Sequence, residues 1–287
     1  MVPLGLLPDL SHPHPRQVLS DRLRPRVAAD RAGARACVPS EADMMAVEMR
    51  DIAKTFRSAR GPNHVFEHLN AAFPRGASVG ILGARGAGKS TLIRLIGGST
   101  LPDHGKVRRV GSISPPVATT QAYHAALTGR ENLHFVARVN GFDGDAAARF
   151  VARFAQMGEA IDHPLSSYTR ERRARFLFAA SYAMPFDIFI ADEALFGGAG
   201  VFRERCAELV QARRAQATLI FTTRSPQMLR RFADIGAVLH EGQLHMFDRI
   251  GDAIRLYRTI DDSAADAPLE DDDTEERYVD EPFGPLA

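Results

Sequence analysis

Gly83-Ala-Arg-Gly-Ala-Gly-Lys-Ser-Thr91 is the stretch of sequence that decides the fold. Its first eight residues match the phosphate-loop pattern G-x-x-x-x-G-K-[ST] without a gap. Phosphate oxygens need several donors converging from one side, and a loop of small residues can turn its backbone N–H groups inward. An apolar strand is predicted at 78–82 and a helix at 89–96, and this is the context in which the pattern binds phosphate. The sequence therefore predicts an α/β protein with a nucleotide site at this loop.

The whole loop is expected to take part in nucleotide binding, through Gly83, Arg85, Gly86, Ala87, Gly88, Lys89, Ser90 and Thr91. Lys89 should reach the terminal phosphates and assist catalysis there, while the Ser90 hydroxyl should bind Mg²⁺. A chance glycine-rich turn is the alternative, and the strand before the loop and the helix after it argue against that alternative.

A second element of the site is predicted in Phe186-Asp-Ile-Phe-Ile-Ala-Asp-Glu193, an apolar strand that ends in two acids. The carboxyl ends of parallel strands meet at one edge of a sheet, so Asp192 should lie beside the phosphate loop and hold Mg²⁺ directly or through water. Glu193 should point the other way and orient or deprotonate the attacking water. A strand that ends in a solvated acidic turn is the alternative.

Further strands and helices alternate along the chain, which predicts a mainly parallel sheet covered on both faces. Thr128-Gly-Arg-Glu131 is a capping box that opens a helix through Asn140. The remaining predictions are helices at 145–157, 171–184, 201–216 and 250–259, a helix capped by Ser225-Pro226, a strand at 218–223 and a hairpin at 235–245.

Composition excludes several classes of protein. The 287 residues carry a formal net charge of +1, which gives no reason to expect nucleic acid as a partner. Cys37 and Cys206 are the two cysteines, and they offer neither a disulfide framework nor a metal-binding spacing, so a reducing compartment is expected. No apolar run is long enough to span a membrane.

Both ends of the chain differ in composition from the part between them. Residues 1–43 are rich in Pro and Arg and are predicted to be a disordered extension, or an artefact of the choice of start site, since Met44 and Met45 follow. Residues 261–287 hold eleven acids against one base and are predicted to be a disordered, solubilising acidic tail.

The order of these elements resembles the ATP-binding subunits of ABC transporters. It resembles most closely the branch that exports capsular and related polysaccharides in Gram-negative bacteria. The resemblance covers roughly residues 46–259, and the start of a helix at Leu127-Thr-Gly-Arg-Glu-Asn132 is more diagnostic than the phosphate loop. The other stretches that carry it are 47–56, 78–83, 92–98, 135–138, 173–175 and 236–239, together with Asp192-Glu193.

The resemblance implies an ABC-type domain at 44–260, with a mainly parallel sheet flanked by helices, an antiparallel β region and a helical subdomain at about 122–184. It also implies ATP and Mg²⁺ as cofactors, an integral membrane permease as a partner, and a dimer with itself or with a paralogous ATPase subunit. The location implied is peripheral, on the cytoplasmic side of the bacterial inner membrane. Phe56 is expected to stack on adenine, where the family usually has Tyr; a core Phe is the alternative.

Several positions depart from the family. The signature that caps the partner's ATP, close to Tyr-Ser-Ser-Gly-Met-Arg-Ala-Arg, reads Tyr168-Thr-Arg-Glu-Arg-Arg-Ala-Arg175 here. Arg170 replaces a serine that would touch the γ-phosphate, and Glu171 replaces a glycine that would let this phosphate approach. Arg224 falls at the switch histidine and Ala199 at the aspartate that couples the two sites of a dimer.

Three hypotheses follow. The first is an ATPase subunit that drives polysaccharide export as a dimer, with reduced hydrolysis. The second is a catalytically impaired ABC-type module with a structural or regulatory role beside an intact paralogue, which the departures favour. The third, a kinase or GTPase with the same phosphate loop, lacks support because neither a guanine-reading Asn-Lys-x-Asp nor a lid motif is visible.

Overall fold

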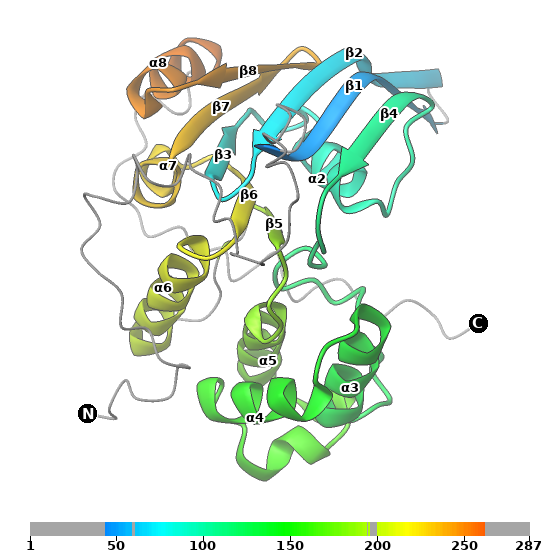
Figure 1. Ribbon diagram of the computed structural model, residues 1–287, viewed down its shortest axis with the longest axis vertical. Helices are drawn as coiled ribbons and strands as arrows, with labels where there is room; N and C mark the ends of the chain where they lie inside the picture. Colours follow the sequence, from blue (N-terminus) through cyan, green and yellow to red (C-terminus); the bar gives the residue numbers. More distant parts are fainter. Residues whose placement is uncertain (1–43, 59–60, 194, 196–199, 262–287) are drawn as a thin grey trace, which may run out of the picture. The chain divides into compact units, whose positions relative to one another are not determined.

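The computed structural model describes residues 44–58, 61–193, 195 and 200–261. Two sheets organise these residues (Figure 1). The first is antiparallel, with the order β2-β1-β4, and is built from β1 (Met45–Ser58), β2 (Gly61–Pro74) and β4 (His104–Arg109). The second has the order β5-β6-β3-β7-β8. Its strands are β3 (Ser78–Leu82), β5 (Ile188–Asp192), β6 (Thr218–Thr223), β7 (Ile235–His240) and β8 (Gln243–Phe247).

The second sheet confirms the mainly parallel α/β fold that the sequence predicts. Strands β5, β6, β3 and β7 run parallel, and β8 returns antiparallel after the turn at Glu241 and Gly242. Leu82 pairs with Thr223, and Asp192 pairs with Thr222. The ends of β3, β5 and β6 therefore lie side by side at one edge of the sheet, where a ligand site is expected in an open α/β sheet.

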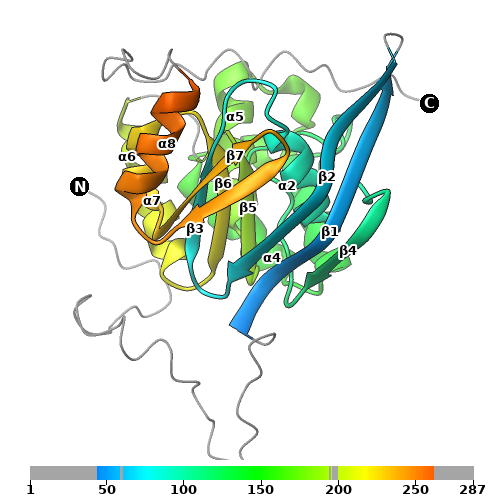
Figure 2. The same ribbon diagram turned by 90° about the horizontal axis from the view of Figure 1, so that it is seen from above.

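Each face of the second sheet has its own hydrophobic core. Helix α2 (Lys89–Gly97) lies between the two sheets (Figure 2). It packs there in a core that includes Val79 and Ile81 of β3. Leu82 points to the opposite face, since successive residues of a strand alternate sides. That second core is covered by helices: α3 (Gly129–Asn140), α4 (Gly144–Phe154), α5 (Arg170–Tyr182), α6 (Gly200–Arg214), α7 (Pro226–Phe232) and α8 (Ile250–Ile260).

The predicted helix at 145–157 is too long at its end. Helix α4 ends at Phe154 because Gln156 adopts a φ of 55°, a left-handed conformation that a helix cannot continue through. Short 3₁₀ helices follow at η2 (Gly158–Asp162) and η3 (Leu165–Ser167). The packing of α3, α4 and α5 is continuous with the core under the sheet, and the subdomain boundaries at about 122 and 184 stay a prediction.

Some predictions lie outside the described residues, namely those for the extension at 1–43, the tail from residue 262 and Ala199. Within the part of the chain that the structure describes, no helix is both long and apolar enough to cross a membrane.

Candidate nucleotide-binding site

The phosphate loop needs glycine for two physical reasons. Gly86 and Gly88 have φ values of 85° and 97°, in the left-handed region that residues with a side chain rarely adopt. A Cβ on Gly88 would also lie 2.7 Å from Cγ1 of Val65, so the antiparallel sheet packs directly against the end of the loop. The loop then enters α2, where the positive end of the helix dipole favours an anion.

Lys89 is the first residue of α2, and only 4% of its surface is exposed. Its Nζ donates hydrogen bonds to the carbonyl oxygens of Gly83, at 2.7 Å, and Ala84, at 3.0 Å. The same Nζ lies 3.2 Å from Oε1 of Glu193, which balances the buried charge. A phosphate group that binds Lys89 must therefore compete with these three oxygen atoms.

The two acids at the end of β5 have different surroundings. Thr222, on the neighbouring strand, donates its hydroxyl proton to Oδ1 of Asp192 at 2.8 Å and accepts the Glu193 N–H at 3.0 Å. Glu193 has a φ of 60°, and this sharp turn sends its carboxylate towards Lys89. Arg224 approaches the same oxygen atom, with its Nε 3.8 Å from Oε1. Glu193 thus has two cations within reach of its carboxylate.

The sequence pattern did not predict these contacts of Glu193. Neither the Lys89–Glu193 ion pair nor the role of Thr222 has a sequence signature, since both arise from strand pairing and from one left-handed residue. A threonine on the strand adjacent to an acidic pair is the sequence signal that could have indicated the role of Thr222.

The donor set around the loop suits Mg²⁺. Ser90 and Thr91 are half-buried hydroxyl residues in the first turn of α2, and Asp192 is a half-buried carboxylate. Hydroxyl and carboxylate oxygens are hard ligands of the kind that this ion prefers. Arg85 is exposed at the rim of the loop and Ala87 is half-buried.

Phe56 lies on β1 with 37% of its surface exposed, so the alternative of a core residue is wrong. The Nζ of Lys54 lies 5.3 Å from the centre of its ring, a distance at which a cation is attracted to an aromatic face. Lys54 on β1 is the strand-pairing partner of Phe66 on β2, and the ring of Phe66 lies near Gly88 of the phosphate loop. Phe56 is two residues further along β1, away from the loop. An exposed ring in this position can stack on a nucleobase, and that role stays a prediction.

The altered signature forms the start of α5. Thr169 caps this helix by accepting a hydrogen bond from the Arg172 N–H at 3.2 Å. Arg170 and Glu171 occupy its exposed first turn, and the Glu171 carboxylate pairs with Arg175 one turn later. The segment is therefore a well-formed helix start, and its two replaced residues both present side chains to solvent.

The Leu127–Asn132 stretch has a clear structural role. Thr128 and Glu131 form the predicted capping box at the start of α3. Asn132 is buried, accepts the His124 N–H at 2.7 Å and donates to the carbonyl oxygens of His124, Leu127 and Thr128. These bonds fix the turn before α3, so the stretch organises the backbone and contributes no reactive group of its own.

Comparison with known proteins identifies the family. The ABC transporter family model matches residues 66–195. The chain is 34% identical over 215 residues to the polysialic acid transport ATP-binding protein KpsT of Escherichia coli. The match covers 74% of this chain and 98% of KpsT. The chain belongs to the ABC transporter ATP-binding proteins, in the capsule polysaccharide export branch.

Other relatives agree with this assignment. This ABC protein is 33% identical to the ATP-binding protein BexA of Haemophilus influenzae, over 74% of this chain and 97% of BexA. It is 31% identical to the capsule polysaccharide export ATP-binding protein CtrD of Neisseria meningitidis serogroup B, over 75% of this chain and 99% of CtrD.

Solved structures support the fold. A dimeric ATP-binding cassette in a post-hydrolysis state, bound to ADP and Pi, superposes with a TM-score of 0.61 at 18% identity, over 71% of this chain and 99% of that chain. Another ATP-binding subunit of an ABC transporter superposes with a TM-score of 0.61 at 20% identity, over 78% of this chain and 95% of that chain. The fold expected from the resemblance is therefore confirmed.

Proposed function

We propose that this ABC protein is the ATP-binding subunit of an exporter of capsular or related polysaccharide, which energises a membrane permease. The observation that carries the proposal is the site in which Lys89, Asp192 and Glu193 converge at one edge of the sheet. The names of KpsT and CtrD, which match this chain over nearly their whole length, supply the class of cargo.

In this proposal, ATP binding begins with an exchange of partners at Lys89. The terminal phosphates take the ammonium group, while backbone N–H groups of the loop and the start of α2 bind the remaining oxygens. Glu193 loses Lys89 as its ion-pair partner and keeps Arg224. The freed carboxylate then orients a water molecule for attack on the γ-phosphorus and accepts its proton as the bond to the β-phosphate oxygen breaks.

Ser90 and Asp192 would hold Mg²⁺, which when bound neutralises charge on the phosphates. Phe56 would stack on the adenine. The proposed assembly is a dimer, formed with a second copy or with a paralogous subunit. It also includes a permease that holds the protein on the cytoplasmic side of the inner membrane.

ATP turnover tests this function. The purified chain should hydrolyse ATP slowly alone and faster with its permease in a lipid bilayer, and Lys89→Ala should abolish the activity. Turnover that equals the Lys89→Ala background in every mixture would contradict an ATPase function.

A catalytically impaired module beside an intact paralogue is the second candidate. It is favoured by the exposed Arg170 and Glu171 at the start of α5, and by Arg224 in place of the switch histidine. In that case the chain alone would bind ATP without turnover, and activity would depend on the paralogue's lysine and not on Lys89.

A further inference from the structure

The carboxylate of Glu193 lies within reach of two cations that differ in how free they are to move. Nζ of Lys89 is 3.2 Å from Oε1, and Nε of Arg224 is 3.8 Å from the same oxygen atom. Only 4% of the Lys89 side chain is exposed, whereas 42% of the Arg224 side chain is exposed. The shorter contact therefore involves the cation that the phosphates need, and the longer contact involves a cation at the surface of the site.

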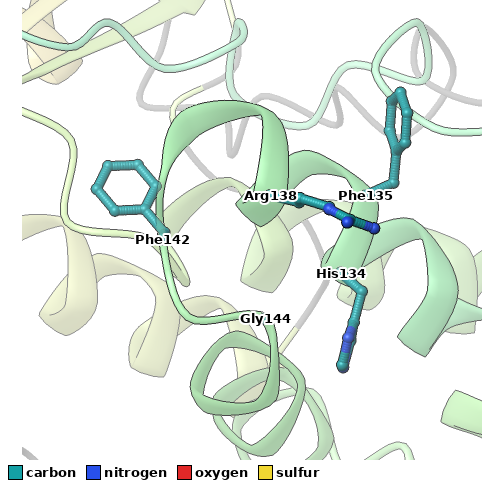
Figure 3. A pocket seen from close by; sticks show the side chains of 5 residues that line it. All are labelled: His134, Phe135, Arg138, Phe142 and Gly144. Carbon is teal, nitrogen blue, oxygen red and sulfur yellow. The ribbon is translucent and has the colours of Figure 1, made fainter.

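Nucleotide binding must rearrange these charges, because the phosphates have to displace oxygen atoms that already contact Nζ of Lys89. A cavity of about 370 Å³ lies elsewhere, beside α3, and its lining residues are His134, Phe135, Arg138, Phe142 and Gly144 (Figure 3). The Phe142 ring points away from Phe135 and packs against the buried Phe186, with 5.0 Å between the ring centres. This cavity is no part of the phosphate loop, so access to Lys89 depends on moving the Glu193 carboxylate.

The backbone on both sides of Arg224 is fixed, so its side chain starts from a defined position. Arg224 directly follows β6, whose Thr222 contacts both acids at the end of β5. Thr223 accepts the Ser225 N–H at 3.0 Å, and Ser225 in turn caps α7 by accepting the Met228 N–H. Movement is left to the Arg224 side chain. Because 3.8 Å is longer than a hydrogen bond, its guanidinium can still close on the carboxylate.

The loss of Lys89 to the phosphates gives Glu193 a reason to turn to Arg224. Only 24% of the Glu193 side chain is exposed, and a carboxylate that is partly removed from water needs a cation or hydrogen bonds in compensation. A guanidinium supplies both through two parallel N–H donors. Repulsion between two cations at one oxygen atom also falls when Lys89 leaves. Arg224 therefore makes the release of Lys89 easier.

We propose that Arg224 takes Glu193 over from Lys89 when nucleotide binds, so that Arg224 favours nucleotide binding and restrains hydrolysis. The restraint arises because a carboxylate bonded to a guanidinium is held away from the attacking water and is a poorer acceptor for its proton. Arg224 is thus a positioning residue that acts through Glu193. The restraint rests on the proposed ATPase function, whereas the exchange of partners requires only that nucleotide binds Lys89.

A double-mutant cycle measured by calorimetric titration of ADP tests the exchange without interference from turnover. We expect Arg224→Gln to raise the Kd for ADP by about two- to fivefold, the size of effect that a partly exposed ion pair has on an equilibrium. In the Glu193→Gln background the same substitution should leave the Kd unchanged, since Lys89 then has no carboxylate to release. Arg230→Gln is the matched control and should bind like the parent protein, because Arg230 is an exposed arginine in the last turn of α7.

Turnover at saturating ATP is the second readout. Arg224→Gln should raise kcat about twofold or more, because the same ion pair no longer holds the carboxylate. Weaker ADP binding together with faster turnover separates this role from damage to the fold, which would lower both affinity and rate. The Tm of each variant checks folding.

The other outcomes overturn the proposal. An unchanged Kd in Arg224→Gln excludes the exchange. An equal loss of affinity in the Glu193→Gln background also excludes it, because Arg224 then acts on the phosphates directly. A kcat that is unchanged or lower in Arg224→Gln excludes the restraint. If no variant turns over ATP above the Lys89→Ala background, the proposed ATPase function and the restraint fail together, while the ADP cycle still decides whether the exchange occurs.

Discussion

Removing the charge of Glu193 should strengthen nucleotide binding while it abolishes hydrolysis. In the structure, Oε1 of Glu193 lies 3.2 Å from Nζ of Lys89, and the phosphates must displace it. At this distance the direct attraction is about 5 kcal/mol for an effective dielectric constant of about 20. Most of this is offset by the solvation that Glu193 regains when it is released, since 24% of its side chain is exposed.

We therefore expect a net gain of about 1–2 kcal/mol for Glu193→Gln, which lowers the Kd by about 5- to 30-fold. Isothermal titration calorimetry with ADP measures this without interference from turnover. Glu208→Gln, an exposed residue on α6, is the matched control and should bind like the parent protein. If Glu193→Gln leaves the Kd unchanged or raises it, Glu193 does not compete with the phosphates for Lys89 and the reasoning is refuted.

Three further predictions concern other parts of the domain. Glu171→Gly should raise ATP turnover, because it removes a side chain and a like charge from the signature; an unchanged or lower rate would show that this departure does not limit hydrolysis. Gly129→Ala should destabilise the fold by about 1–3 kcal/mol, seen as a lower Tm, because the new methyl group would lie 2.6 Å from the Tyr168 hydroxyl; an unchanged Tm would contradict the close packing. Hydrogen bonds from the Ser112 N–H and hydroxyl lower the pKa of the Asp187 carboxyl group. The stability that these bonds give the fold is therefore complete above the ordinary pKa of aspartate, and it is lost as pH falls through the lowered pKa of Asp187. Ser112→Ala should weaken this acid dependence in unfolding titrations, and identical pH profiles would exclude it.

Much of the fold followed from the sequence because local signals agreed with each other. The strand at 78–82 and the capping box at Thr128 lie where the sequence predicted them. Apolar strands buried on both faces and helices with capping residues are short-range patterns, and they hold in any tertiary context.

The antiparallel sheet was not resolved into strands from local patterns. β1 and β2 shift register at several points, and Asp51 and His68 adopt φ values of 52° and 97°. Such bulges break the alternation of apolar and polar residues that identifies a strand. This sheet was expected only through the family resemblance.

The candidate site shows the same division. The sequence predicted which residues meet at the sheet edge, because a motif specifies the loop and the two acids directly follow an apolar strand. The orientation of Glu193 towards Lys89 depends on one left-handed residue and on Thr222 of a neighbouring strand. Contacts of this kind depend on the assembled structure.

Calorimetric titration of ATP with Mg²⁺ into the parent protein and into Lys89→Ala tests the central claim most directly, with the Tm of both proteins measured as a control for folding. We predict a saturable heat for one site in the parent protein and an affinity at least about tenfold lower in Lys89→Ala, which loses the charge that faces the phosphates. No heat from the folded parent protein, or equal affinity in both proteins, would contradict the assignment of this loop as the nucleotide site.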